Sequence, residues 1–167
     1  ECLLATAKLT GMIFLILIGA DLFNAFLAIT QMPTQAATSI ANSGLSPMMV
    51  LALILMMYLV LGCVMDSMSM ILITIPVLFP IVMKLDFGMT PEHTAIWFGI
   101  LVLICVEVGL ITPPFGLNVF VINSLAPEVP MAESFRGVMP FLLSDFIRVL
   151  ALIAFPIITL GVLRILG

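Results

Sequence analysis

The sequence predicts an all-α integral membrane protein that contains a re-entrant helical hairpin and a broken transmembrane helix. Of its 167 residues, 63% are hydrophobic and only 8% are charged, and the mean hydropathy is +1.39. Soluble domains carry about 25% charged residues, so this chain cannot cover a globular surface with polar groups. Apolar runs of membrane length recur along it, and prolines interrupt two of them, which is where we expect the irregular elements.

The same composition argues against several other classes of protein. The net charge of −4 is spread over few residues, with no basic cluster that would indicate nucleic acid or anionic lipid as a partner. Cys2, Cys63 and Cys105 lack the spacing of metal ligands and are expected to be small buried residues. The opening ECLLATAKLT does not have the arrangement of a secretory signal. Because the chain starts at Glu1 rather than methionine, we expect it to be a piece of a longer polypeptide.

Residues 1–46 are predicted to form a transmembrane helix and an arm at the membrane interface. Leu3–Thr30 is long enough to cross a bilayer at about 1.5 Å per residue. Its apolar surface is interrupted by three polar residues, Lys8, Asp21 and Asn24. One side of this helix should therefore pack against protein. Gln31–Ser46 is polar and small, with apolar residues at helical intervals, which favours an interfacial connector.

The next two apolar runs differ in length. Met48–Met65 is uncharged and of full membrane length, so we predict a spanning helix there. Ile71–Met83 is too short to span comfortably and contains Pro76 and Pro80. Short apolar segments interrupted by proline are candidates for arms that enter the membrane and turn back. We therefore predict a re-entrant hairpin at about residues 62–83.

The second irregular element is predicted in Glu107–Phe120, EVGLITPPFGLNVF, inside a helix expected over residues 94–126. Neither Pro113 nor Pro114 can donate a backbone hydrogen bond, so the helix should break at Thr112–Gly116. Lipid cannot satisfy the backbone groups that a break frees, so the break should be buried in protein or line a wet cavity that holds an ion or solute. The alternative is a proline kink in an ordinary spanning helix.

The flanking segments complete the predicted order of elements. The hydrophilic link Lys84–His93 ends in a typical helix start, Thr90-Pro91-Glu92, because Thr can cap, Pro fits the first turn and Glu favours the positive end. After a second half-helix at Leu117–Leu125, a connector at Pro130–Gly137 should lead to a final helix over residues 138–166. Lysine and arginine total five, too few to assign an orientation.

Oxygen-bearing residues at the hairpin and at the break are the candidate ligands. Asp66, Ser67 and Ser69 offer carboxylate and hydroxyl oxygens, which suit a hard cation such as sodium or the polar groups of a small anion. The alternative places Asp66 at the membrane surface between two ordinary helices. At the break, the carbonyls that end the first half-helix could hold a cation, and the positive end of the half-helix near Gly116 would face an anion.

Three charged residues in apolar surroundings are interpreted as supporting groups. Glu107 lies about one turn before the predicted break, and burying a lone carboxylate costs several kcal/mol unless it is paired or hydrated. We expect it to stabilise the unwound loop by hydrogen bonding, with a cation or proton site as the alternative. Asp145 and Arg148 are three residues apart on one helical face, which predicts a local ion pair.

The order of these features resembles the C-terminal half of the large membrane subunit of tripartite ATP-independent periplasmic (TRAP) transporters, the DctM-like family. The resemblance covers nearly the whole chain, and its most specific part is the double-proline motif. The motifs that carry it are Gly62-Cys-Val-Met-Asp66, Ile75-Pro76-Val-Leu-Phe-Pro80, Glu107-Val-Gly-Leu-Ile-Thr-Pro-Pro-Phe-Gly-Leu-Asn118, and Phe135-Arg-Gly-Val-Met-Pro-Phe141 followed by Asp145 and Arg148. One departure is Cys105, because family members often have asparagine just upstream of this glutamate.

The resemblance implies an elevator-type transporter repeat, with residues 1–46 in the scaffold and residues 47–167 in the moving transport domain. It implies sodium as the coupling ion and no cofactor, with sodium held at Ser67, Thr112 and Gly116. The implied ion and substrate contacts are Gly62, Asp66, Ser67, Ser69, Gly109, Thr112, Pro113, Pro114, Gly116 and Asn118, supported by Glu107, Asp145 and Arg148.

The partners implied by the resemblance are the lipid bilayer, a small DctQ-like membrane subunit and a periplasmic DctP-like substrate-binding protein. The location implied is the bacterial or archaeal cytoplasmic membrane. The leading hypothesis is thus a sodium-coupled importer of a C4-dicarboxylate or similar carboxylate. A site between two repeats would need the other half of the permease, so this half is not expected to transport alone.

Three other functions are alternatives to this hypothesis. A stand-alone symporter of divalent anions and sodium with a related fold would work without a binding protein. An intramembrane hydrolase would need a nucleophile with a base, but Ser67 and Ser69 have only Asp66 nearby, and the single histidine, His93, lies in a loop. A purely structural membrane anchor would leave the double proline and Glu107 unexplained.

Overall fold

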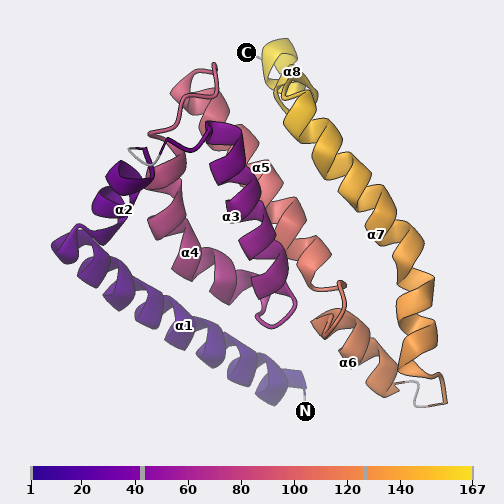
Figure 1. The fold of residues 1–167 in the computed structure, drawn as a ribbon. Coiled ribbons are helices and arrows are strands. Elements are labelled where there is room, and N and C mark those ends of the chain that lie inside the picture. The colour runs from indigo at the N-terminus through magenta and orange to yellow at the C-terminus, as the bar shows by residue number, and fades with distance from the viewer. Residues whose placement is uncertain (1, 42–43, 126–127, 167) are drawn as a thin grey trace.

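The computed structural model describes residues 2–41, 44–125 and 128–166, and all regular elements within these ranges are α-helices (Figure 1). This agrees with the predicted all-α class. Among the described residues, three helices, α1, α5 and α7, are long and apolar enough to cross a membrane. In chain order the helices are α1 (Cys2–Thr30), α2 (Met32–Ala41), α3 (Pro47–Gly62), α4 (Ser67–Val82), α5 (Pro91–Gly109), α6 (Leu117–Leu125), α7 (Met131–Ala154) and α8 (Ile157–Leu166).

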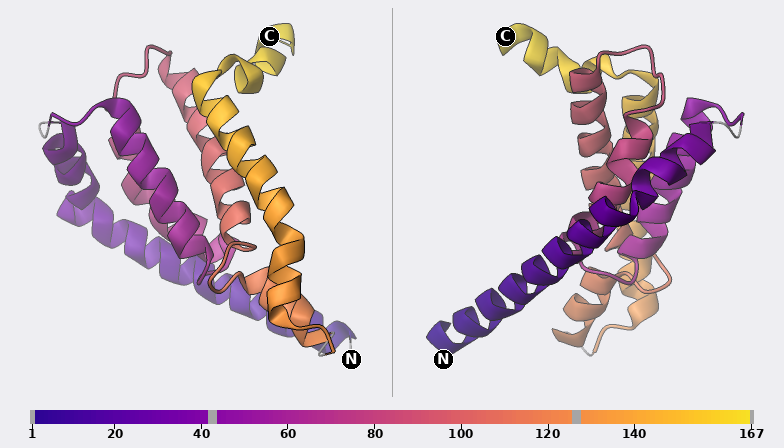
Figure 2. Two further views of the ribbon diagram at one scale, coloured as in Figure 1. Left: turned by 45° about the vertical axis from the view of Figure 1, so that its right-hand side comes forward. Right: turned by 90° about the vertical axis from the view of Figure 1, so that its left-hand side faces the viewer.

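The helices form an open arrangement centred on α3 and α5, which make the most extensive contact between two helices. α3 and α4 form a hairpin whose arms diverge from a turn at residues 63–66, and α7 runs along the far side of α5 (Figure 1). α2 packs on α4, so the predicted connector is helical and joins the hairpin. α1 contacts α4 as well, while its N-terminal part projects away from the other helices (Figure 2).

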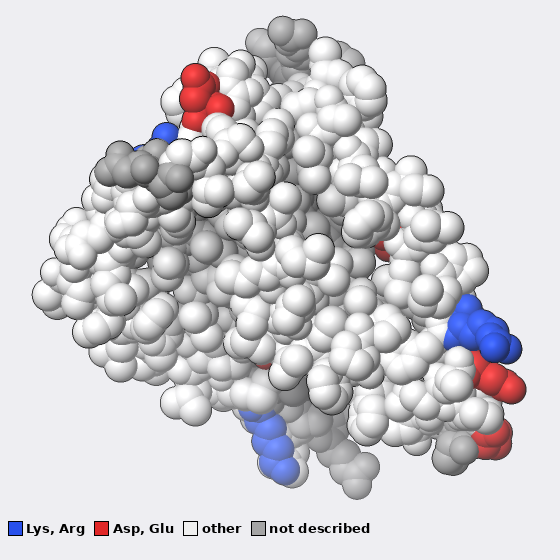
Figure 3. All heavy atoms as spheres, in the orientation of Figure 1, with Lys and Arg blue, Asp and Glu red and all other residues white. Residues whose placement is uncertain are grey.

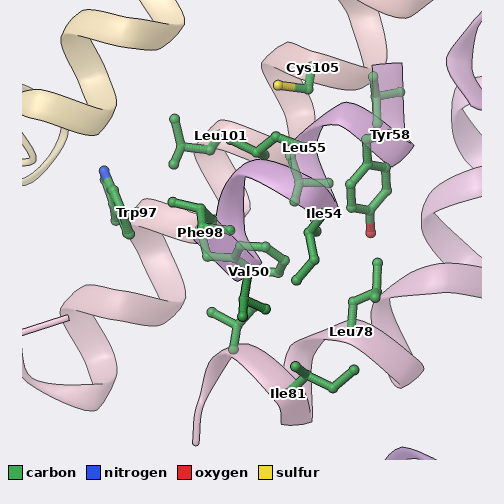
Figure 4. Close-up of a cluster of buried hydrophobic side chains, with 14 of the residues drawn as sticks. Val50, Ile54, Leu55, Tyr58, Leu78, Ile81, Trp97, Phe98, Leu101 and Cys105 are labelled. Carbon is green, nitrogen blue, oxygen red and sulfur yellow. The ribbon is translucent and has the colours of Figure 1, made fainter. Parts of the chain in front are cut away.

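The buried core lies where α3, α4 and α5 meet (Figure 4). Tyr58 of α3 is fully buried, and its hydroxyl shares a 2.7 Å hydrogen bond with the hydroxyl of Thr74 in α4. Because an unpaired hydroxyl is costly to bury, this bond favours one arrangement of the two hairpin arms. The largest fully buried side chains are Trp97, Tyr58, Phe98, Leu51, Met70 and Leu101.

The hairpin differs from its predicted bounds. α3 ends at Gly62 after 16 residues and is not a full span to Met65, while α4 also has 16 residues and continues through Pro76 and Pro80. At about 1.5 Å per residue each arm is roughly 24 Å long, less than the roughly 30 Å of a bilayer core. The two short helices and the turn between them therefore make one helical hairpin over residues 47–82, and its entry into the membrane at about 62–83 stays a prediction.

α5 begins at the predicted start signal Thr90-Pro91-Glu92, three residues before the expected residue 94. The Thr90 side chain accepts a hydrogen bond from the backbone N–H of His93 at 3.3 Å, and Pro91 occupies the first turn. The helix ends at Gly109 and α6 starts at Leu117, so the predicted interruption lies inside an irregular segment of residues 110–116. That α5 and α6 are two halves of one broken transmembrane helix stays a prediction.

The predicted connector at 130–137 and single helix at 138–166 are wrong in their bounds. α7 already begins at Met131, directly after Pro130, and it ends at Ala154. α8 is a separate helix from Ile157 onward. The physical reason for the break is Pro156, which has no backbone N–H with which to continue the helical bonding pattern.

Charged groups are few on the face shown in Figure 3, and most of them lie near its margins. Between them extends a broad surface without charge. Together with the three membrane-length apolar helices, this surface is that of a multi-pass membrane protein.

Candidate functional site

The C-terminal ends of α3 and α5 touch through two glycines. A Cβ atom added at Gly62 would lie 2.9 Å from the Cα of Gly109, and one added at Gly109 would lie 2.8 Å from the Cα of Gly62. Real Cβ atoms essentially never approach other atoms so closely. The two main chains are therefore in direct contact, which only glycine at both positions permits.

This contact places the hairpin turn beside the irregular segment that follows α5. The Sγ of Cys63, the first residue of the turn, lies 3.9 Å from the carbonyl oxygen of Pro113 and 3.3 Å from that of Leu59. The first of these contacts joins residues 50 positions apart in the chain. The two segments that the sequence singled out independently thus form one region of the structure. We call residues 63–66 the hairpin turn and residues 110–116 the unwound loop.

The unwound loop is held at both of its ends. The Thr112 hydroxyl donates a hydrogen bond to the carbonyl of Val108 at 2.6 Å, and the backbone N–H of Thr112 donates one to the carbonyl of Gly109 at 3.0 Å. The backbone N–H of Asn118, in the first turn of α6, donates across the loop to the carbonyl of Leu110 at 3.0 Å. The Pro113–Pro114 peptide bond is cis, and Gly116 has a φ of +49°, in the left-handed region.

Several carbonyl groups of the unwound loop have no hydrogen-bond donor in the part of the chain that the structure describes. They belong to Ile111, Thr112, Pro114 and Phe115. Pro113 and Pro114 are also exposed, so this side of the loop faces outward from the described residues. Unpaired carbonyl oxygens in an apolar setting need water, a further protein segment or a cation.

The polar residues of the hairpin turn lie at the start of α4. The Asp66 carboxylate accepts a hydrogen bond from the backbone N–H of Ser69 at 2.9 Å and so caps this helix. That N–H also lowers the pKa of Asp66 below its usual value. Ser67 and Ser69 are half-buried in the first turn, and no hydrogen bond joins either of them to Thr112 among the described residues.

The supporting residues predicted from the sequence lie outside this region or at its edge. Glu107 is exposed on α5, and its carboxylate has no hydrogen-bond or ion-pair partner within the described ranges. Asp145 and Arg148 form the predicted ion pair on α7, at 2.8 Å. Asp145 also lines an open pocket of about 170 Å³, together with Cys105 and the neighbouring apolar side chains of α3, α5 and α7.

The structure thus brings some of the predicted residues together and separates others. Gly62, Gly109 and the two irregular segments meet, whereas Asp145 and Arg148 form their own pair on another helix. The sequence reasoning missed the contact of Phe135 with Gly116. Phe135 was noted only as part of a motif, and no spacing rule indicates that its ring would reach the unwound loop.

Comparison with known proteins identifies similar sequences along the whole chain. The family model for the DctM component of the tripartite ATP-independent periplasmic transporter matches residues 1–158. The chain is 35% identical over 170 residues to the C4-dicarboxylate TRAP transporter large permease protein DctM of Pseudomonas aeruginosa, covering 100% of this chain and 38% of that protein. It is 32% identical over 161 residues to the sialic acid TRAP transporter large permease protein SiaM of Vibrio cholerae, covering 96% and 36%.

A further relative is the isethionate TRAP transporter permease protein DctMQ of Oleidesulfovibrio alaskensis, 29% identical over 126 residues, or 75% of this chain and 19% of that protein. The chain therefore spans less than two fifths of the length of each of these relatives. No solved structure matches it.

Proposed function

Since this chain belongs to the family of the DctM component of tripartite ATP-independent periplasmic transporters, we propose that it supplies half of the ion and solute pathway of a sodium-coupled organic-acid importer. The named relatives are transporter permeases and not enzymes. We further propose that the complete subunit lies in the cytoplasmic membrane, works with a small membrane subunit and receives its solute from a periplasmic binding protein. The name of one relative, DctMQ, supports the small-subunit partner.

The observation that carries the proposal is the contact between the hairpin turn and the unwound loop. It rests on the two adjoining glycines, Gly62 and Gly109, and on the approach of Cys63 to Pro113. The loop carbonyls without donors, together with the Thr112 hydroxyl oxygen, are hard oxygen ligands of the kind that suits sodium. We propose that sodium binds at Ser67, Thr112 and the backbone near Gly116.

An organic acid is supported by the electrostatics of the same region. Both α4 and α6 begin here, and the N-terminal end of a helix carries a partial positive charge that favours an anion. A bound sodium ion would add positive charge close by. The solutes in the names of three relatives, a C4-dicarboxylate, sialic acid and isethionate, are all organic anions. We propose a carboxylate-bearing solute.

The direct backbone contact also supports movement of the site as one body. Because nothing lies between Gly62 and Gly109, α3 and α5 have no space in which to slide past one another. We propose that the hairpin of residues 47–82 and the segment of residues 91–125 travel together in an elevator mechanism, with residues 1–46 belonging to the scaffold.

The test is uptake into proteoliposomes that hold the complete large subunit with its small partner. Uptake is measured with and without an inward sodium gradient, and with and without the binding protein. Dependence on both is the expected result. Uptake driven by sodium without the binding protein would favour the stand-alone symporter, and uptake that is independent of sodium would overturn the coupling.

Two variants and a matched control then test the site itself. Thr112→Val and Ser67→Ala each remove one oxygen ligand. Loss of a ligand that contributes about 1.4 kcal/mol to sodium binding raises the sodium concentration for half-maximal uptake about tenfold, and this is the expected result. Thr159→Val is the control, because the Thr159 hydroxyl makes a similar local bond, to Pro156 at 2.6 Å, but lies in α8. Unchanged sodium dependence in both site variants would rule out the proposed ligands.

A further inference from the structure

The ring of Phe135 packs directly on the unwound loop. Phe135 lies near the start of α7, and its Cε1 atom is 3.0 Å from the position where a Cβ of Gly116 would stand. The same position is 3.3 Å from the main-chain carbon of Ile111 and 3.3 Å from the carbonyl oxygen of Thr112. Gly116, which is buried, is therefore enclosed between the Phe135 ring on one side and the beginning of its own loop on the other.

The residue before Phe135 makes a second connection to the same element. The Ser134 hydroxyl donates to the side-chain oxygen of Asn123 in α6 at 2.9 Å, and this bond is partly buried. Gly116 directly precedes α6, whereas Asn123 lies near its end. Two adjacent residues of α7 thus contact the last residue of the unwound loop and a residue near the end of α6, which restrains the position of the loop.

From these contacts we propose that Phe135 is a positioning residue for ion binding, acting through Gly116 on the carbonyl oxygen of Thr112. This inference rests on the proposed function of the unwound loop. Phe135 itself contributes no oxygen ligand. Its rigid ring fills the space beside Gly116, so the backbone at Gly116 cannot move away from the Thr112 carbonyl. The ligands of a binding site must be held to within about 0.5 Å of their productive positions.

The test is the sodium dependence of uptake by the complete large subunit with its small partner and binding protein in proteoliposomes. Phe135→Leu removes the ring but stays apolar, and Phe135→Tyr keeps the ring. Phe141→Leu is the matched control, because Phe141 lies on the same helix but is 69% exposed. We expect Phe135→Leu to raise the sodium concentration for half-maximal uptake about threefold to tenfold, with little change in the rate at saturating sodium. Phe135→Tyr and Phe141→Leu should stay close to wild type.

A merely structural role gives a different pattern. It would lower the amount of folded protein or the maximal rate and leave the sodium concentration for half-maximal uptake unchanged, and that outcome would overturn the proposal. If Phe135→Leu does not fold, Phe135→Met also removes the ring, its unbranched side chain can adapt to the irregular space, and the same criterion applies to it. Wild-type uptake without sodium dependence would instead refute the proposed function, so the two failures are distinguishable.

Discussion

The indole N–H of Trp97 donates a 2.8 Å hydrogen bond to the backbone carbonyl of Leu152. Leu152 lies four residues before Pro156, the position whose N–H would normally bond to this carbonyl within a helix. Proline has no such N–H, so the Leu152 carbonyl would be left without a donor in a buried setting. Trp97, which is fully buried in α5, supplies the donor and joins α5 to the end of α7.

Trp97→Phe should therefore destabilise the protein. It keeps an aromatic ring but leaves the Leu152 carbonyl unpaired, which costs about 1–3 kcal/mol. The free energy of unfolding of the detergent-purified complete subunit measures the loss. In a Pro156→Ala background the residue at 156 regains an N–H, so Trp97→Phe should cost clearly less. An equal cost in both backgrounds would show that the lost bond is not the cause.

Alanine at either of the two touching glycines should separate α3 from α5. The added Cβ would lie 2.9 Å from Gly109 at one position and 2.8 Å from Gly62 at the other, against backbone atoms that cannot turn aside. We expect Gly62→Ala and Gly109→Ala each to cost about 1–3 kcal/mol and to abolish most uptake.

The control for this pair is Gly99→Ala, on the same helix as Gly109. Nothing lies within 4 Å of a Cβ at Gly99, and alanine favours a helix over glycine by about 0.5–1 kcal/mol. This variant should melt at or above the wild-type temperature. If Gly62→Ala and Gly109→Ala behaved like the control, the close contact between the two helices would be refuted.

Substitutions of Asp66 separate helix capping from ion binding. Asp66→Ala removes the bond to the Ser69 N–H and should cost about 1 kcal/mol, whereas Asp66→Asn still caps and should cost only a few tenths. Thermal unfolding without sodium measures the cap. A raised sodium requirement in Asp66→Asn with unchanged stability would assign the carboxylate to the ion site as well.

The same cap predicts a pH dependence. Because the Ser69 N–H lowers the pKa of Asp66, the charged cap stabilises the folded protein above the ordinary carboxyl pKa. Its contribution is lost as the pH falls through the lowered pKa of the folded state. The difference in stability between wild type and Asp66→Ala should therefore be constant near neutral pH and shrink only under acidic conditions.

Neutralising one residue of the ion pair on α7 should destabilise the protein more than neutralising both. Asp145→Asn leaves Arg148 without its 2.8 Å partner on an apolar helix, and an unpaired charge in a membrane helix is costly because lipid does not solvate it. The double variant Asp145→Asn with Arg148→Gln leaves no charge, so it should recover about 1–2 kcal/mol of that loss. Additive effects of Asp145→Asn and Arg148→Gln in unfolding experiments would contradict a coupled pair.

Features that depend on a few neighbouring residues were predictable. The start of α5 at Pro91 follows from the chemistry of Thr90 and proline, and the interruption after Gly109 follows from two prolines that cannot donate. The ion pair of Asp145 and Arg148 follows from their spacing on one helix. In contrast, the predicted end of α3 was three residues too late, since the turn and the cap at Asp66 interrupt an apolar run that continues to Met65.

The sequence by itself determined the membrane class, the helical content and the two irregular segments, because hydropathy, caps, prolines and glycines act locally. Only the tertiary structure decided that Gly62 meets Gly109, and that Phe135 packs on Gly116. In a soluble protein the buried face of a helix differs in polarity from the exposed one. In α3 and α5 the two sides of each helix are similarly apolar, so the pattern of hydrophobic residues does not indicate which face packs, and the shape of the glycine surfaces selects the contact.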